Sequence, residues 1–179
     1  MGGLIGLFVV AVLVILGMLG HHSSSSHQST TLPTFGVPKF LNIGQAGTTN
    51  APVQPDNGAN SIPVTVTASS LTPEVSPTSG YAVAMTYCAV SSPIDAARAN
   101  SNLALSLTGD NNPSPTFNAA LSTKWSNNLN PGACQSGTSY FTLATPIPVG
   151  DQVVTVRFGP ELDSSSMEWI TNAVLPPPP

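Results

Sequence analysis

The amino-acid sequence predicts an all-β protein, in which one antiparallel β-sandwich follows a single N-terminal transmembrane helix. Three observations lead to this prediction. Residues 2–20 contain no polar side chain. Further along the chain, several short segments alternate apolar and polar residues with a period of two, as half-buried strands do. Turn sequences rich in Gly, Pro, Asn and Asp separate these segments, and only one short segment has helical character.

The apolar run at 2–20 has the length of a membrane span. A helix of this length measures about 28 Å, close to the hydrocarbon thickness of a bilayer. We therefore predict that residues 1–20 form a signal-anchor helix, with residues 4–19 in the membrane. A buried core helix is disfavoured because the run is apolar on every side. A cleaved secretory signal is the alternative, although Met18-Leu19-Gly20 has a bulky residue where a cleavage site needs a small one.

Residues 21–40 are predicted to be a flexible stalk. The stalk begins with HHSSSSHQSTT, which has too little apolar surface to fold. Its three His residues are capable of metal binding, but a solvated tether explains them as well. The first basic residue after the apolar run is Lys39, so charge alone does not orient the helix. The folded domain is expected at 41–175, and the polyproline tail at 176–179 is too short to indicate a partner.

The composition indicates an exported domain and excludes a nucleic-acid binder. The chain has four basic and eight acidic residues among 179, with a net charge of −4. Four scattered basic residues make no electrostatic footprint for nucleic acid. The two cysteines, Cys88 and Cys134, are predicted to form one disulfide, which places the domain outside the cytoplasm. The alternative is a pair of free thiols in a cytosolic domain.

The individual strands follow from the alternation of apolar and polar residues. Strands are predicted at 62–68, 81–88, 102–108, 139–144 and 153–158, with weaker signals at 116–121 and 167–171. The expected inward residues are Ile62, Val64, Val66, Ala68, Leu103, Leu105, Leu107, Phe141, Leu143, Val154, Val156 and Phe158. In the strand at 81–88, both faces are expected to be partly covered. Residues 94–99 are expected to form one or two helical turns, and Val149-Gly150-Asp151 a turn.

The domain lacks the residue patterns of common enzymes. All three His residues lie in the stalk, so no Ser-His-Asp, Cys-His or His-zinc arrangement is available to the domain. Most of the eight carboxylates lie beside turn residues. Glu161 with Asp163, and Asp110 with its two following Asn residues, are close enough to share a cation, but the calcium-loop spacing is absent. We therefore expect no catalytic residues, metal or cofactor. A pair of carboxylates that hydrolyses a polysaccharide is the enzymatic alternative.

The two tryptophans are expected to have different roles. Trp169 lies in a predicted strand and is expected in the core. Trp125 follows Lys124 and precedes a polar Ser-Asn-Asn run, so partial exposure is as plausible as burial. An exposed aromatic ring on an uncharged surface binds sugar rings or protein partners. Trp125 is therefore the candidate ligand contact.

Residues 128–143 contain a Leu-x-Pro-Gly turn, a Gly five residues later and a Phe four residues after that Gly. A later strand ends in Phe-Gly-Pro, and residues 41–45 match an opening strand. These features resemble a small immunoglobulin-like domain family of unknown function that is common in actinobacterial envelope proteins. That family is related in fold to the mycobacterial immunoprotective extracellular protein. The resemblance covers roughly 41–158 and implies an immunoglobulin-like sandwich outside the membrane, with no established activity.

Together these observations predict a membrane-anchored, extracytoplasmic, non-catalytic binding or interaction module of the bacterial cell envelope. Its expected contacts are the membrane, through residues 4–19, and an envelope protein or glycan. If the N-terminal segment is cleaved, the domain is secreted. The alternatives are a structural or immunogenic surface protein without a dedicated ligand, and a carboxylate-dependent hydrolase of envelope polysaccharide.

Overall fold

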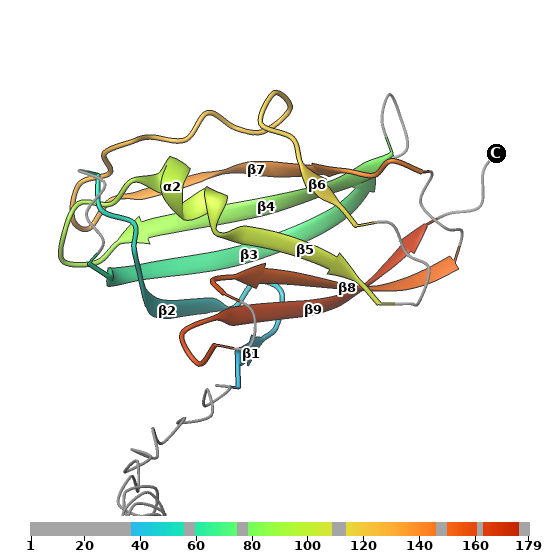
Figure 1. Cartoon of the computed structure of the whole chain (residues 1–179), viewed down its shortest axis with the longest axis horizontal. Helices are drawn as coiled ribbons and strands as arrows, with labels where there is room; N and C mark the ends of the chain where they lie inside the picture. Colours follow the sequence, from blue (N-terminus) through green and yellow to red (C-terminus); the bar gives the residue numbers. More distant parts are fainter. Residues whose placement is uncertain are drawn as a thin grey trace, which may run out of the picture. The chain divides into compact units, whose positions relative to one another are not determined.

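The computed structural model describes residues 37–55, 60–74, 79–108, 114–145, 150–160 and 163–175. These residues form two β-sheets that pack as a sandwich, which confirms the predicted all-β architecture (Figure 1). The predicted membrane span, the stalk up to residue 36 and the tail at 176–179 lie outside the described residues. Within the described part of the chain, no helix is long and apolar enough to cross a membrane.

One sheet has five strands in the order β2-β3-β4-β7-β6, and all its neighbours are antiparallel. Its strands are β2 (Ala46–Ala51), β3 (Ile62–Glu74), β4 (Gly80–Ala89), β7 (Cys134–Thr142) and β6 (Thr116–Phe117). The two longest, β3 and β4, contain the clearest alternating segments of the sequence. They pair along almost their whole length, with one register shift between Ala68 and Ser70.

The second sheet has four strands in the order β1-β9-β8-β5. Its strands are β1 (Lys39–Leu41), β9 (Met167–Leu175), β8 (Gly150–Phe158) and β5 (Leu103–Leu107). β1 runs parallel to β9, with Lys39 opposite Met167, so the prediction of a wholly antiparallel sandwich is wrong for this pair. The pair joins the first and last strands of the domain, and no local sequence pattern encodes such a distant partner.

The opening of the domain also differs from the prediction. The expected strand at 41–45 is instead the end of β1 followed by a turn, in which Gln45 N–H donates to the Asn42 carbonyl at 2.9 Å. Gly44 has a φ of +88°, a conformation that glycine adopts without strain. β2 follows this turn, although its sequence AGTTNA has no large apolar residue. A Cβ at Gly47 would overlap Met167 Sδ and lie 2.7 Å from Leu41 Cδ1, so these side chains, where they stand, leave no room for a larger residue at position 47.

Two further boundaries change for identifiable reasons. The strand expected at 116–121 ends at Phe117, because the Asn118 side chain turns the chain by accepting the N–H groups of Ala120 and Leu121 at 3.1 and 3.3 Å. The turn expected around Gly150 is instead the beginning of β8, which pairs with the end of β9.

The core lies between the two sheets and contains the inward residues that the alternation predicted. These residues are buried, except for half-buried Leu107; the buried set is Ile62, Val64, Val66, Ala68, Leu103, Leu105, Phe141, Leu143, Val154, Val156 and Phe158. In β4, Tyr81, Val83, Met85 and Tyr87 are buried, and the other face is partly covered, as expected. Trp169 is fully buried, which confirms its core role, and its Nε1–H donates to the Gln45 carbonyl at 2.9 Å.

The single described helix, α2 (Ala96–Ser101), connects β4 to β5. It begins two residues later than the predicted segment 94–99 because Asp95 acts as its N-cap rather than its second residue. The Asp95 carboxylate accepts the N–H of Arg98 at 2.8 Å, which satisfies one of the free donors of the first turn. The buried face of α2 consists of Ala96, Ala99 and Asn100.

We predict that Asp95→Ala destabilises the domain by about 1 kcal/mol, the usual contribution of an N-cap side chain. The Arg98 N–H loses its acceptor, while the rest of the helix keeps its contacts. Urea denaturation followed by circular dichroism measures the change. Asp95→Asn is the matched control, because an Asn side chain also caps helices. An equal loss in both variants would contradict the capping role.

Candidate functional site

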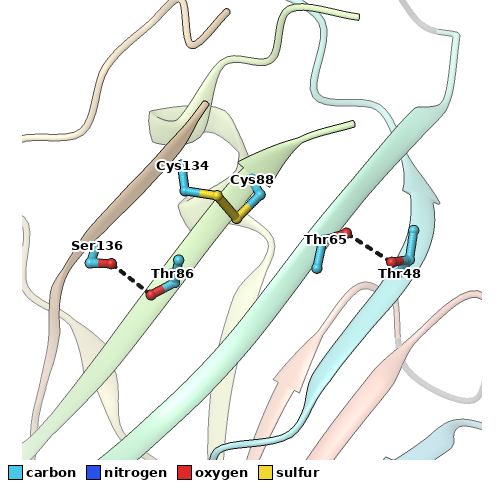
Figure 2. The surroundings of a disulfide bond; sticks show 6 residues. All are labelled: Thr48, Thr65, Thr86, Cys88, Cys134 and Ser136. Carbon is cyan, nitrogen blue, oxygen red and sulfur yellow. Dashed lines mark hydrogen bonds between the residues drawn. A yellow bond between two sulfur atoms is a disulfide. The ribbon is translucent and has the colours of Figure 1, made fainter. Parts of the chain in front are cut away.

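The predicted disulfide is present between Cys88 of β4 and Cys134 of β7 (Figure 2). The two residues are direct cross-strand partners, with Cα atoms 4.1 Å apart. The neighbouring residue Tyr87 points into the core and is fully buried, so Cys88 lies on the outer face of the sheet. The bridge therefore ties adjacent strands of one sheet on their outer side, instead of joining the two sheets across the core.

Hydroxyl side chains surround the disulfide on this outer face. Thr48 of β2 and Thr65 of β3 share a hydrogen bond of 2.8 Å, and so do Thr86 of β4 and Ser136 of β7 (Figure 2). Cross-strand pairs of this kind contribute roughly 0.2–1 kcal/mol each. The four side chains carry no charge and bond to one another, so they stabilise the sheet without presenting a charged group to a partner.

Two of the described carboxylates have local structural roles. Asp95 caps α2, and the Asp163 carboxylate accepts the N–H of Ser165 at 2.7 Å, a bond that holds the pKa of Asp163 below its usual value. Within the ranges that the structure describes, no three His, Cys, Asp or Glu side chains come close enough to hold a metal ion. The other members of the two cation-sharing groups, Glu161 and residues 110–112, lie outside those ranges.

Trp125 is buried, which decides between the two alternatives, burial and partial exposure, that the sequence left open. Only 7% of the residue is exposed. Its ring meets Tyr87 edge to face, with ring centroids 5.0 Å apart and an interplanar angle of 76°. Its Nε1–H is also buried and has no hydrogen-bond partner. Since an unsatisfied buried donor costs about 1–3 kcal/mol and is rare in folded proteins, this N–H calls for a reason.

Next to Trp125 lies a buried polar network that the sequence analysis missed. Asn100 of α2 is 2% exposed, and its Oδ1 accepts hydrogen bonds from Tyr87 OH, at 3.0 Å, and from Ser139 Oγ. Burial raises the pKa of Tyr87 far above its usual value, so the phenol stays protonated and remains a donor. One signal was available in the sequence: Asn100 shares the buried helix face with Ala96 and Ala99.

Asn100 and Trp125 both line a hollow of about 330 Å³, which we call the Trp125 hollow. One wall is α2, which contributes Ala97, Asn100 and Ser101; the other is the segment 117–127, which includes Phe117, Lys124 and Trp125. The sequence analysis thus identified one residue of this hollow, Trp125. The helix α2, which forms the opposite wall, lies more than twenty residues before Trp125 in the chain.

The segment that forms the second wall is held along the edge of β7 by hydroxyl groups. Thr123 N–H donates to the Thr138 carbonyl at 2.8 Å, and Thr138 N–H donates back to Thr123 Oγ1 at 2.8 Å. Tyr140 N–H donates to Ser122 Oγ at 2.9 Å. These bonds take the place of a neighbouring strand, so they protect the sheet edge and fix this wall of the hollow.

A larger cleft of about 550 Å³ lies where β2 ends and β5 begins. Its lining includes the neutral polar side chains of Thr49, Asn50, Ser61 and Asn102. Asp163 is the one carboxylate among the described residues that line it, whereas hydrolysis of a glycosidic bond by the common mechanism uses two. This cleft suits hydrogen bonding to a neutral molecule better than acid-base chemistry.

Comparison with known proteins identifies the fold. No protein-family model and no curated protein matches the sequence. Among solved structures, the chain is similar to MPT63, a secreted protein from Mycobacterium tuberculosis, with a TM-score of 0.52 and 16% sequence identity. The match covers 75% of this chain and 98% of that one. The chain therefore has a β-sandwich fold like that of MPT63, in agreement with the family resemblance seen in the sequence.

Proposed function

We propose that this chain is a non-catalytic binding module of the bacterial cell envelope, displayed outside the membrane and anchored by residues 4–19. Three observations support the location. The apolar run has the length of a bilayer span. Cys88 and Cys134 are bonded, as is usual in proteins that fold in oxidising compartments. The fold is similar to that of MPT63, a secreted protein.

The binding role rests on one observation, the unsatisfied Nε1–H of Trp125 beside the hollow that its ring lines. Folded proteins rarely keep a buried donor without an acceptor, and an acceptor atom of a bound molecule would satisfy this one. Trp125, proposed from the sequence as an exposed contact, is thus proposed here as a buried wall of the ligand site. An envelope glycan or an envelope protein is the expected partner.

The location is tested with protease added to intact cells. The sandwich domain is expected to be removed, because a domain held outside the membrane by residues 4–19 is accessible to the enzyme. Lysed cells provide the control for cleavage itself. Loss of the domain only after lysis would mean that it faces the cytoplasm. Domain recovered in the culture medium, without the N-terminal residues, would mean that the segment is a cleaved signal.

The binding role is tested by co-sedimentation of the full chain, in detergent, with isolated envelope material. Native protein is expected in the pellet. Asn127→Trp should reduce this binding because it places a bulky side chain at the exposed Asn127 in the lining of the hollow. Asn128→Trp is the matched control, since Asn128 is an equally exposed neighbour that does not line this hollow. Equal binding by the two variants would refute the hollow as the site.

A second candidate is a structural or immunogenic surface protein without a dedicated ligand. The self-paired hydroxyls on the outer face of the five-stranded sheet favour it, because they suit a stable, solvated surface. Under this alternative, native protein stays in the supernatant in the co-sedimentation experiment.

A further inference from the structure

Three residues that line the Trp125 hollow carry hydrogen-bond donors without a described acceptor. Trp125 Nε1–H has no acceptor. Asn100 Oδ1 already accepts two hydrogen bonds, and no described residue accepts from its Nδ2–H₂ group. Lys124 is exposed in the lining and brings an ammonium group, one of only four basic side chains in the chain. Three different donors, one of them charged, thus belong to residues that line this hollow.

Two hydroxyl groups of the lining already donate within the protein. Ser101 Oγ donates to the Arg98 carbonyl at 2.7 Å, and Ser122 Oγ donates to the Asn118 carbonyl at 2.7 Å. Among the described residues, no carboxylate lines the hollow. The one charged side chain among the described residues of this lining is Lys124, so a matching ligand carries a negative charge, together with acceptors for the free donors. A carboxylate provides both, since its two oxygens accept several hydrogen bonds and attract the ammonium group.

The rest of the lining indicates which kind of molecule carries this carboxylate. Phe117 is 38% exposed, and its ring is held in place edge to face by Phe141, with ring centroids 5.8 Å apart. Ala97 and Ala119 add further apolar surface. An exposed aromatic face with polar groups around it suits the C–H face of a sugar ring. The volume of about 330 Å³ accommodates one such ring and is at the small end of ligand sites.

From these contacts we propose that the Trp125 hollow binds a carboxylated sugar residue of the uronic acid type. The carboxylate accepts hydrogen bonds from Lys124, from the Asn100 amide and from the indole N–H, while the ring lies against Phe117. This inference rests on the proposed binding function and names the ligand class for the same site. A peptide with a free terminal carboxylate has the same charge as a uronic acid but no sugar ring, and the experiment below distinguishes these two ligands.

The test follows the two indole N–H resonances of the full chain in detergent micelles by NMR, with glucuronate as the probe. The chain has two tryptophans, so the spectrum contains two such signals. The signal of Trp125 should shift on titration, while that of Trp169, bonded to Gln45, should stay in place. Glucose should bind at least roughly tenfold more weakly, because the charge-assisted hydrogen bonds are absent. Acetyl-glycine, a carboxylate without a sugar ring, should also bind more weakly.

Lys124→Met should weaken glucuronate binding roughly tenfold without altering thermal stability, since the side chain is exposed. Lys39→Met is the matched control, because Lys39 is the one other lysine and lies in β1, outside the hollow. Equal effects of the two substitutions, no shift of the Trp125 signal, or equal affinity for glucose would each overturn the proposal. Tighter binding of acetyl-glycine would assign the site to peptide carboxylates instead. Envelope binding that persists in these cases would leave the proposed function standing with another ligand.

Discussion

Replacing Cys88 with Ser is expected to lower the free energy of unfolding by about 2–5 kcal/mol, as loss of a native bridge does in small exported domains. Cys88 and Cys134 are separated by 46 positions in the sequence. In the unfolded chain the bridge closes a long loop, which contains the residues that form α2, β5 and β6 in the folded domain. Breaking the bridge opens this loop and increases the entropy of the unfolded state. Urea denaturation of the full chain in detergent, followed by circular dichroism, measures the difference.

Two controls separate the bridge from its surroundings. Thr86→Ala removes the neighbouring hydroxyl pair with Ser136 but keeps the disulfide, so it should cost less than about 1 kcal/mol. Native protein treated with reductant should unfold like Cys88→Ser. If reduction and substitution both left the unfolding curve unchanged, the stabilising role would be wrong. Two alkylated thiols in non-reduced protein taken from cells would argue for a cytoplasmic domain.

Asn100→Ala is expected to destabilise the domain by about 2–5 kcal/mol, through the loss of a shared acceptor. The Asn100 side chain accepts from Tyr87 OH and from Ser139 Oγ, and both of these donors are buried. Without Asn100, two buried hydroxyls lose their partner, and each unsatisfied group costs about 1–3 kcal/mol. The same bonds attach α2 to β4 and β7, so thermal unfolding should begin at a clearly lower temperature.

Removing either donor should cost much less than removing the acceptor. Ser139→Ala and Tyr87→Phe each delete one hydroxyl, and the Asn100 oxygen still accepts from the other. Each is therefore expected to cost about 0.5–1.5 kcal/mol, the net contribution of an ordinary hydrogen bond. If Ser139→Ala were as harmful as Asn100→Ala, packing rather than hydrogen bonding would explain the effect.

The sequence alone predicted the features whose physical cause is local. β3 and β8 could be recognised because alternate residues face the core, and a period of two records that burial directly. The burial of Trp169 followed from its place in such a strand. The Cys88–Cys134 pairing followed from there being only two cysteines in a domain whose composition indicated export. The helix was predicted two residues too early, because the sequence does not distinguish a capping role of Asp95 from a position inside the helix.

The tertiary structure decided what depends on residues distant in the sequence. β1 pairs in parallel with β9 at the opposite end of the domain, and position 47 of β2 is a glycine that lies against Met167 of the other sheet. Trp125 stands in a polar stretch that suggests exposure, yet it is buried because Tyr87 of β4 packs against its ring. The unsatisfied N–H of Trp125 has no local signature, and the helical spacing of Asn100 with Ala96 and Ala99 indicates only its burial. The two residues come together only where α2 meets the segment that follows β6.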